Sequence, residues 1–121
     1  MNKTYHLSNC TTCQAILKET GIDKKAERNE ILLQDIKLEK ITAAQLEEMK
    51  KMAGSYEALF SRRAMKYKEL GIKDKKLQEK DYKDYILGEY TFLKRPVTIL
   101  GDRIFIGNDK KTVEALKKAV K

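Results

Sequence analysis

Hydrophobic and polar residues recur with recognisable periods along the first third of the chain. A short β-prone run at residues 3–7 leads into a turn, and apolar residues with helical spacing follow from residue 11 to about residue 20. Gly21 ends this helix, and the run at 30–36 is typical of a second strand. The pattern therefore predicts a strand, a loop, a helix and another strand, in that order.

Only helical spacing is found in the middle of the chain. Thr42 and Gln45 stand three residues apart at the beginning of an apolar run, which is a signature of a helix start, and Gly54 marks the end of that helix. We expect two further helices, one at 56–70 with an interruption near 61–63, and one at about 77–87.

The last third returns to short strands. Runs at 92–100 and 103–106 flank the pair Gly101-Asp102 and predict a β-hairpin, and a final helix follows Asn108-Asp109. The element order β-α-β, helices, β-β-α predicts an α/β fold. We expect a single domain, 1–121, with a core at about 1–40 and 90–121 and a helical insertion at about 41–89.

Composition favours a soluble, cytoplasmic protein. The chain of 121 residues is 41% hydrophobic and 36% charged, too apolar for a disordered chain and too charged for a membrane protein. Its longest aliphatic runs are far shorter than the roughly 18 residues of a transmembrane helix. The first residues also lack the apolar centre of a signal peptide, so we expect no membrane partner.

The net charge of +8 first suggests a nucleic acid as partner. Of the 26 basic residues, however, 21 are lysines and only five are arginines, and the lysines alternate with acidic residues in helical patterns. Because base and phosphate recognition favours clustered arginines, we interpret the charge as a solvated surface and predict no direct nucleic-acid contact.

Both cysteines belong to one motif, Cys10-Thr11-Thr12-Cys13. In a reducing compartment such a pair is redox-active or binds metal more often than it forms a structural staple. A closed zinc site needs four ligands, and two cysteines with one histidine are too few, so we predict no metal. A thiol at a helix start is stabilised as thiolate, which favours Cys10 over Cys13 as the reactive group.

The same motif lies between a strand and a helix, and Pro96 directly precedes a later strand, which is the arrangement of a thioredoxin-like fold. Four motifs in this order resemble those of the ArsC/Spx family of arsenate-reductase-like proteins. They are Tyr5-His6 ahead of Cys10, the segment 58–71 (ALFSRRAMKYKELG), Lys94-Arg95-Pro96-Val97 and Gly101-Asp102-Arg103.

This resemblance implies a thiol-dependent oxidoreductase. Cys10 would be the nucleophile that attacks arsenate, Arg63 and Arg95 would hold the anion, and His6 would lie beside the nucleophile. Pro96 would follow a cis peptide bond. Glutathione with glutaredoxin, or another thiol system such as thioredoxin, would complete the reduction, and no bound cofactor is implied.

The residues themselves agree with an oxyanion site. A thiolate attacks an anion only when cations and N–H donors offset the repulsion. The backbone N–H groups of Thr11, Thr12 and Cys13 are suited to that task at a helix start, and arginine binds two oxygens at once. Gln14 stands where many relatives carry an arginine.

Alternatives remain open. The regulatory Spx branch uses a CxxC pair as a redox switch and binds RNA polymerase, so the Cys10/Cys13 pair, with Cys13 as resolving thiol, also fits a regulator. A general disulfide substrate is a third hypothesis. His6 is equally typical of a buried histidine bonded to backbone, and Arg62 and Arg63 of surface helix charges.

Overall fold

The computed structural model describes residues 2–120. The chain divides into two compact units, which are described separately. The core unit consists of the residues up to Lys40 together with those from Arg95 onward, and the insertion unit is Ile41–Lys94.

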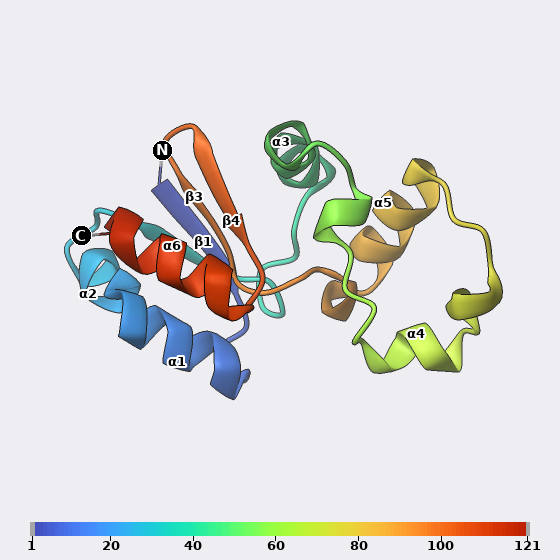
Figure 1. Ribbon diagram of the computed structural model, residues 1–121, viewed down its shortest axis with the longest axis horizontal. Coiled ribbons are helices and arrows are strands. Elements are labelled where there is room, and N and C mark those ends of the chain that lie inside the picture. Colours follow the sequence, from blue (N-terminus) through green and yellow to red (C-terminus); the bar gives the residue numbers. More distant parts are fainter. Residues whose placement is uncertain (1, 121) are drawn as a thin grey trace. The chain divides into compact units, whose positions relative to one another are not determined.

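A four-stranded mixed sheet forms the centre of the core unit (Figure 1). Its order is β2-β1-β3-β4; β1 and β2 are parallel, whereas the other neighbours are antiparallel. This β-α-β and β-β-α topology confirms the predicted α/β, thioredoxin-like fold. The strands are β1 (Asn2–His6), β2 (Leu32–Asp35), β3 (Val97–Leu100) and β4 (Arg103–Ile106).

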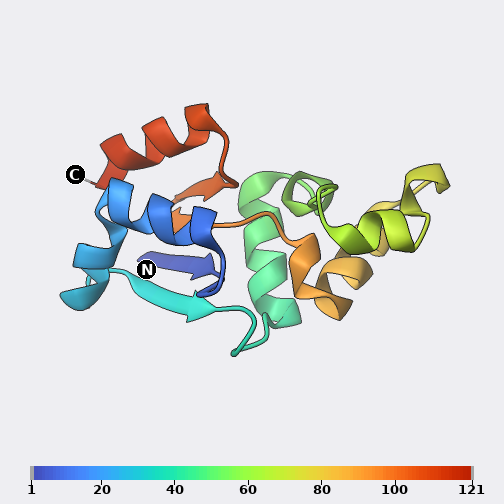
Figure 2. The same cartoon turned by 90° about the horizontal axis from the view of Figure 1, so that it is seen from below.

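Helices α1 (Thr11–Thr20) and α6 (Lys110–Val120) lie side by side against the sheet (Figures 1 and 2). As predicted, α1 ends at Gly21, whose positive φ of 85° suits a residue without a side chain. Their apolar faces meet β4 in one buried cluster. Its members are Ile16, Leu17, Ile22, Ile31, Phe105, Val113, Leu116 and Val120.

The short helix α2 (Ile22–Glu27) was not predicted. It has six residues and a single buried one, Ile22, so its sequence carries no helical period. Helix α2 starts immediately where α1 ends, because Gly21 serves both as the last cap of α1 and the first cap of α2. Burial of Ile22 in the cluster, which sequence spacing does not reveal, holds it there.

In the insertion unit, α3 (Ala43–Ala53) begins with the predicted capping box. The Gln45 backbone N–H donates to Thr42 Oγ1 at 3.1 Å, and the Gln45 side-chain oxygen accepts from the Thr42 N–H at 3.1 Å. Gly54 ends the helix in a left-handed conformation, as expected.

The helix predicted at 56–70 is interrupted near 61–63, as expected, but the prediction is wrong for its first part, which is a 3-10 turn and not an α-helix. The structure has a 3-10 turn, η1 (Glu57–Leu59), and a short helix, α4 (Met65–Glu69). Between them the backbone is extended at Phe60 and Ala64 and forms a turn at residues 62–63. Two backbone hydrogen bonds, Ser61 N–H to Phe92 O at 2.6 Å and Lys94 N–H to Leu59 O at 2.8 Å, draw this segment into an isolated β-bridge. The remaining elements are η2 (Ile72–Asp74), α5 (Glu79–Gly88) and η3 (Tyr90–Phe92).

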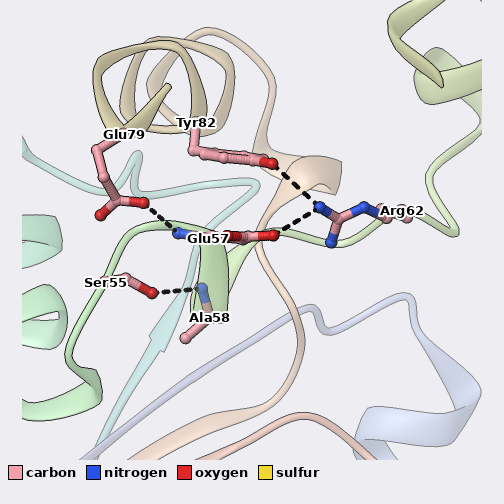
Figure 3. Close-up of polar contacts among 6 residues, drawn as sticks. All are labelled: Ser55, Glu57, Ala58, Arg62, Glu79 and Tyr82. Carbon is pink, nitrogen blue, oxygen red and sulfur yellow. Dashed lines mark hydrogen bonds and ion pairs between the residues drawn. The ribbon is translucent and has the colours of Figure 1, made fainter. Parts of the chain in front are cut away.

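Phe60 is the centre of the insertion unit. It is fully buried, stacks on Phe92 with ring centres 5.1 Å apart, and meets the edge of Tyr82 at 5.0 Å. Arg62 lies over the Phe60 and Tyr82 rings and donates to Tyr82 Oη at 3.1 Å and to the Glu57 carboxylate at 3.0 Å (Figure 3). Arg62 therefore has a structural role within this unit.

No helix among residues 2–120 combines the length and the apolar character that crossing a membrane requires.

Candidate functional site

Cys10 stands at the junction between the loop after β1 and helix α1. It is the residue before the first helical turn, with extended backbone (φ −100°, ψ 111°), and its N–H donates to Leu7 O at 3.1 Å. Its carbonyl accepts the first helical hydrogen bond, from Gln14 N–H at 3.1 Å. The first N–H groups of a helix have no helical acceptor, so they are available to bond the Cys10 side chain.

The two thiols differ in burial and acidity. Cys10 is half-buried and Cys13 fully buried. Burial alone opposes ionisation of Cys10, but the N–H and thiol of Cys13, the Arg95 charge and the Thr12 N–H together lower its pKa below the ordinary 9.0. For Cys13, burial raises the pKa to about 11. Cys10 is therefore the better nucleophile near neutral pH.

Thr11 and Thr12 form the exposed first turn of α1. The backbone N–H groups of Thr12 and Cys13 hydrogen-bond the Cys10 sulfur, as expected for N–H groups at a helix start. The same part of the chain borders an open hollow of about 460 Å³ between α1 and the start of α6. The hollow is lined by Thr11, Thr12, Ala15, Ile16, Glu19, Asn108, Lys110 and Val113.

Arg95 lies two residues before the start of β3, and the peptide bond between Arg95 and Pro96 is cis. The positive charge of Arg95 acts on both thiols and favours the thiolate form of each. The tertiary fold thus brings a residue some eighty-five positions away in sequence into the electrostatic environment of Cys10. This position agrees with an anion-binding arginine.

His6 ends β1 and is 7% exposed. Burial lowers its pKa from the ordinary 6.5, although the Asp35 carboxylate acts in the opposite direction. Its Nδ1 atom lies 3.2 Å from the amide nitrogen of Gln14. A neutral imidazole is therefore the favoured form at neutral pH.

Arg63 belongs to the insertion unit, where it is exposed and its backbone N–H donates to Ser61 Oγ at 3.3 Å. The structure describes Arg63 within that unit only, so its role toward Cys10 stays a prediction.

The sequence analysis did not identify two residues near the Cys10 loop, Gln14 and Asp35, as structural supports of the site. The Gln14 side chain donates to Leu7 O at 2.9 Å, and the Asp35 carboxylate accepts from Ser8 N–H at 3.4 Å. The sequence could have indicated this role for Asp35, because the carboxyl ends of the neighbouring parallel strands β1 and β2 lie at one edge of the sheet. Gln14 carries no such signal, since an exposed helical glutamine is ordinary.

No group of three or more histidine, cysteine, aspartate or glutamate side chains is arranged to hold a metal ion within residues 2–120.

Solved structures with the same fold cover nearly the whole chain. The YffB protein has a TM-score of 0.76 at 20% identity, with 100% of both chains covered. A Staphylococcus aureus protein has a TM-score of 0.69 at 24% identity, covering 95% of this chain and 97% of that one. The arsenate reductase from Vibrio cholerae has a TM-score of 0.72 at 13% identity, covering 97% and 95%.

No curated protein matches the sequence as a relative. The sequence model of the ArsC family matches residues 5–116, which includes both cysteines, His6, Arg63 and Arg95. With this match over nearly its full length, and with the thioredoxin-like fold, the chain belongs to the ArsC family.

Proposed function

We propose that this protein is an arsenate-reductase-like, thiol-dependent oxidoreductase in which Cys10 attacks an oxyanion. The observation that carries the proposal is the difference between two thiols three residues apart: the pKa of Cys10 is lowered and that of Cys13 is raised to about 11. Membership of the ArsC family and the fold shared with the arsenate reductase of Vibrio cholerae support the same chemistry.

Each group has a role in the proposed reaction. Attack of the Cys10 thiolate on arsenic forms an S–As bond, and one arsenate oxygen takes up two protons and leaves as water. Reduction of As(V) to As(III) needs two electrons, which two thiols supply as they join in a disulfide. Glutathione with glutaredoxin is the proposed thiol source, and thioredoxin is the alternative.

The proposed anion site combines fixed donors with arginine. The N–H groups of Thr11, Thr12 and Cys13 face the Cys10 end of helix α1, and Arg95 contributes a charge that already acts on the thiol. Arg63 is proposed as the second arginine of the clamp on the basis of the family motif. No bound organic cofactor or metal takes part in this proposal.

One observation favours a second function. The Cys13 thiol hydrogen-bonds the Cys10 sulfur, so the two sulfurs are already neighbours within one helical turn. An oxidant that converts Cys10 to a sulfenic acid would allow Cys13 to close a disulfide with loss of water. An Spx-like redox switch that controls binding to RNA polymerase is therefore the alternative proposal.

Arsenate turnover by the purified protein tests the first proposal. We expect arsenite formation with glutathione plus glutaredoxin, measured beside a parallel assay with thioredoxin, and we expect Cys10→Ser to abolish it. The matched variant Cys13→Ser distinguishes a nucleophile from a resolving thiol, because it preserves turnover supported by glutathione.

The same purified protein is used to test the alternative proposal of a redox switch. Absence of turnover with every thiol donor, together with capture of RNA polymerase by the oxidised form only, would replace the reductase by the switch. Mass spectrometry of the oxidised protein identifies the Cys10–Cys13 disulfide by the loss of two hydrogens.

A further inference from the structure

The side chain of Gln14 reaches back from helix α1 to the strand and loop that precede Cys10. Its amide nitrogen, Nε2, lies 2.9 Å from the carbonyl oxygen of Leu7 and 3.2 Å from Nδ1 of His6. One terminal amide therefore contacts both the end of β1 and the Cys10 loop.

These two contacts determine how the Gln14 amide and the His6 ring are protonated. A carbonyl oxygen only accepts hydrogen bonds, so the group that faces Leu7 O must be the NH₂ and not the oxygen of Gln14. The second hydrogen of this NH₂ is then available to His6 Nδ1. Nδ1 must act as acceptor, which places the ring proton on Nε2.

We propose that Gln14 is a positioning residue that holds His6 as the neutral tautomer protonated on Nε2 and anchors the loop of Cys10 through the Leu7 carbonyl. Its importance for catalysis rests on the proposed function. The tautomer and the anchoring do not, because both follow from contacts within the core unit.

Leu7 connects this bridge to both cysteines. Its carbonyl also accepts the Cys10 N–H at 3.1 Å, and its backbone hydrogen-bonds the Cys13 sulfur. Loss of the Gln14 donor would remove one of two hydrogen bonds at the Leu7 carbonyl and loosen the turn that presents Cys10. On the other side of the loop, Asp35 accepts from the Ser8 N–H at 3.4 Å.

The bridge also determines the charge at the site. Protonation of His6 at Nδ1 would bring an N–H against the NH₂ of Gln14, so the bridge must break before the ring becomes a cation. A neutral His6 leaves Arg95 and the N–H groups of helix α1 as the positive partners of the Cys10 thiolate. Gln14 thus favours a site whose positive charge does not change near neutral pH.

Nitrogen-15 NMR of the imidazole ring tests the tautomer directly. His6 is the only histidine of the chain, so its two ring nitrogens are assigned without ambiguity. In the wild-type protein at neutral pH we expect Nδ1 to give the signal of an unprotonated nitrogen and Nε2 that of an N–H. The opposite pattern, with the proton on Nδ1, would overturn the proposal.

Three variants separate the bridge from a general effect on the helix. Gln14→Met keeps the length of the side chain but cannot donate, so we expect a mixture of both tautomers. Gln14→Glu presents an acceptor, so we expect the proton to move to Nδ1 and the pKa of His6 to rise. The control Lys18→Met, one turn further along the exposed face of α1, is expected to leave the ring signals unchanged.

Hydrogen exchange of the Cys10 amide tests the anchoring. We expect exchange roughly five- to tenfold faster in Gln14→Met than in the wild type, as for loss of one hydrogen bond, and unchanged exchange in Lys18→Met. Circular dichroism confirms that each variant is folded. An unchanged tautomer together with unchanged Cys10 exchange in folded Gln14→Met would refute the proposal, whatever the protein does to arsenate.

Discussion

The two units of this protein are stabilised in different ways. The core unit is built on a sheet that joins strands from both ends of the chain and on one apolar cluster to which α1, α2, β4 and α6 contribute. The insertion unit has no named strand and is organised by stacked aromatic rings and by side chains bonded to backbone. The difference teaches where the proposed chemistry is located, because Cys10, Cys13, His6 and Arg95 all belong to the core unit with its sheet.

The contrast between the two units is clearest in the partners that hydrogen-bond their backbone N–H and C=O groups. In the core unit, backbone hydrogen bonds between paired strands join β1 to both β2 and β3, and β3 to β4. In the insertion unit, the Glu79 carboxylate accepts from the N–H group of Tyr56 at 2.6 Å and from that of Glu57 at 3.1 Å. Figure 3 shows the second of these hydrogen bonds. Short turns need such side-chain acceptors because they contain too few residues to bond their own backbone.

The largest effect is expected from Phe60→Ala. Removal of a fully buried ring from the aromatic cluster should lower the free energy of unfolding of the insertion unit by about 3–5 kcal/mol. The pKa of Cys10 should not change, because the groups that set it belong to the core unit. Denaturant unfolding and thiolate absorbance measure the two quantities.

Leu70→Ala is the matched control for Phe60→Ala, since Leu70 is 48% exposed and its removal should cost little. A change in the Cys10 pKa in folded Phe60→Ala would break the comparison and show that the two units are energetically coupled.

Arg95→Ala should affect the core unit's chemistry rather than its stability. We expect a loss of about 10²–10³-fold in the rate of arsenate reduction, comparable to removal of one oxyanion donor, and a higher pKa for Cys10. Arg95→Lys should recover part of the rate because it keeps the charge without the planar fork.

Arg28→Ala controls for loss of positive charge, because Arg28 is exposed and belongs to no family motif. Full turnover by folded Arg95→Ala would disprove the anion clamp even if the protein reduces arsenate.

Glu79→Ala tests how much a side-chain acceptor of backbone N–H groups contributes to the stability of the insertion unit. Two backbone donors would lose a charged acceptor, so we expect a loss of about 1–2 kcal/mol in stability, measured by thermal unfolding. Glu69→Ala, which removes only the exposed ion pair with Lys66 at 3.2 Å, should change stability by a few tenths of a kcal/mol, on the order of other surface pairs. Equal effects of both substitutions would contradict this role of Glu79.

The smallest effect is a pH dependence located in the core unit. Because burial lowers the folded-state pKa of His6, the unfolded chain binds a proton first on acidification. Stability should therefore fall slightly as pH decreases from the ordinary value of 6.5 to the lowered pKa, and level off below it. Thermal melts of the wild type and of His6→Gln at several pH values in this window measure the dependence of stability on pH. If stability falls equally with pH in both proteins, a group other than His6 causes the decrease.

Asp35 titrates in a separate window. Burial disfavours its charged form, but the hydrogen bonds from Ser8 and Lys37 and the proximity of His6 lower its pKa from 3.8. The stability that it contributes is thus present above 3.8 and is lost as pH falls through the lower folded value.

The sequence by itself determined the elements whose signals are local. Gly21 and the Thr42–Gln45 box mark helix ends because their effects depend on neighbouring residues only, and the Gly101-Asp102 pair marks the hairpin for the same reason. The motif spacing likewise sufficed to predict the thioredoxin-like fold, and the match to the ArsC family confirms the resemblance.

Only the tertiary structure decided the rest. The sequence predicted an interruption near 61–63, but not that Phe60 pairs there with the distant Leu93 in a β-bridge. The acidity of Cys10 was predicted from its place at a helix start, but the part of it that comes from the Arg95 charge was not. The proposed tautomer of His6 depends on Gln14, whose contact with the ring sequence spacing does not reveal. Burial and charge act through space, so residues distant along the chain determine them, whereas caps and turns are determined by the residues next to them.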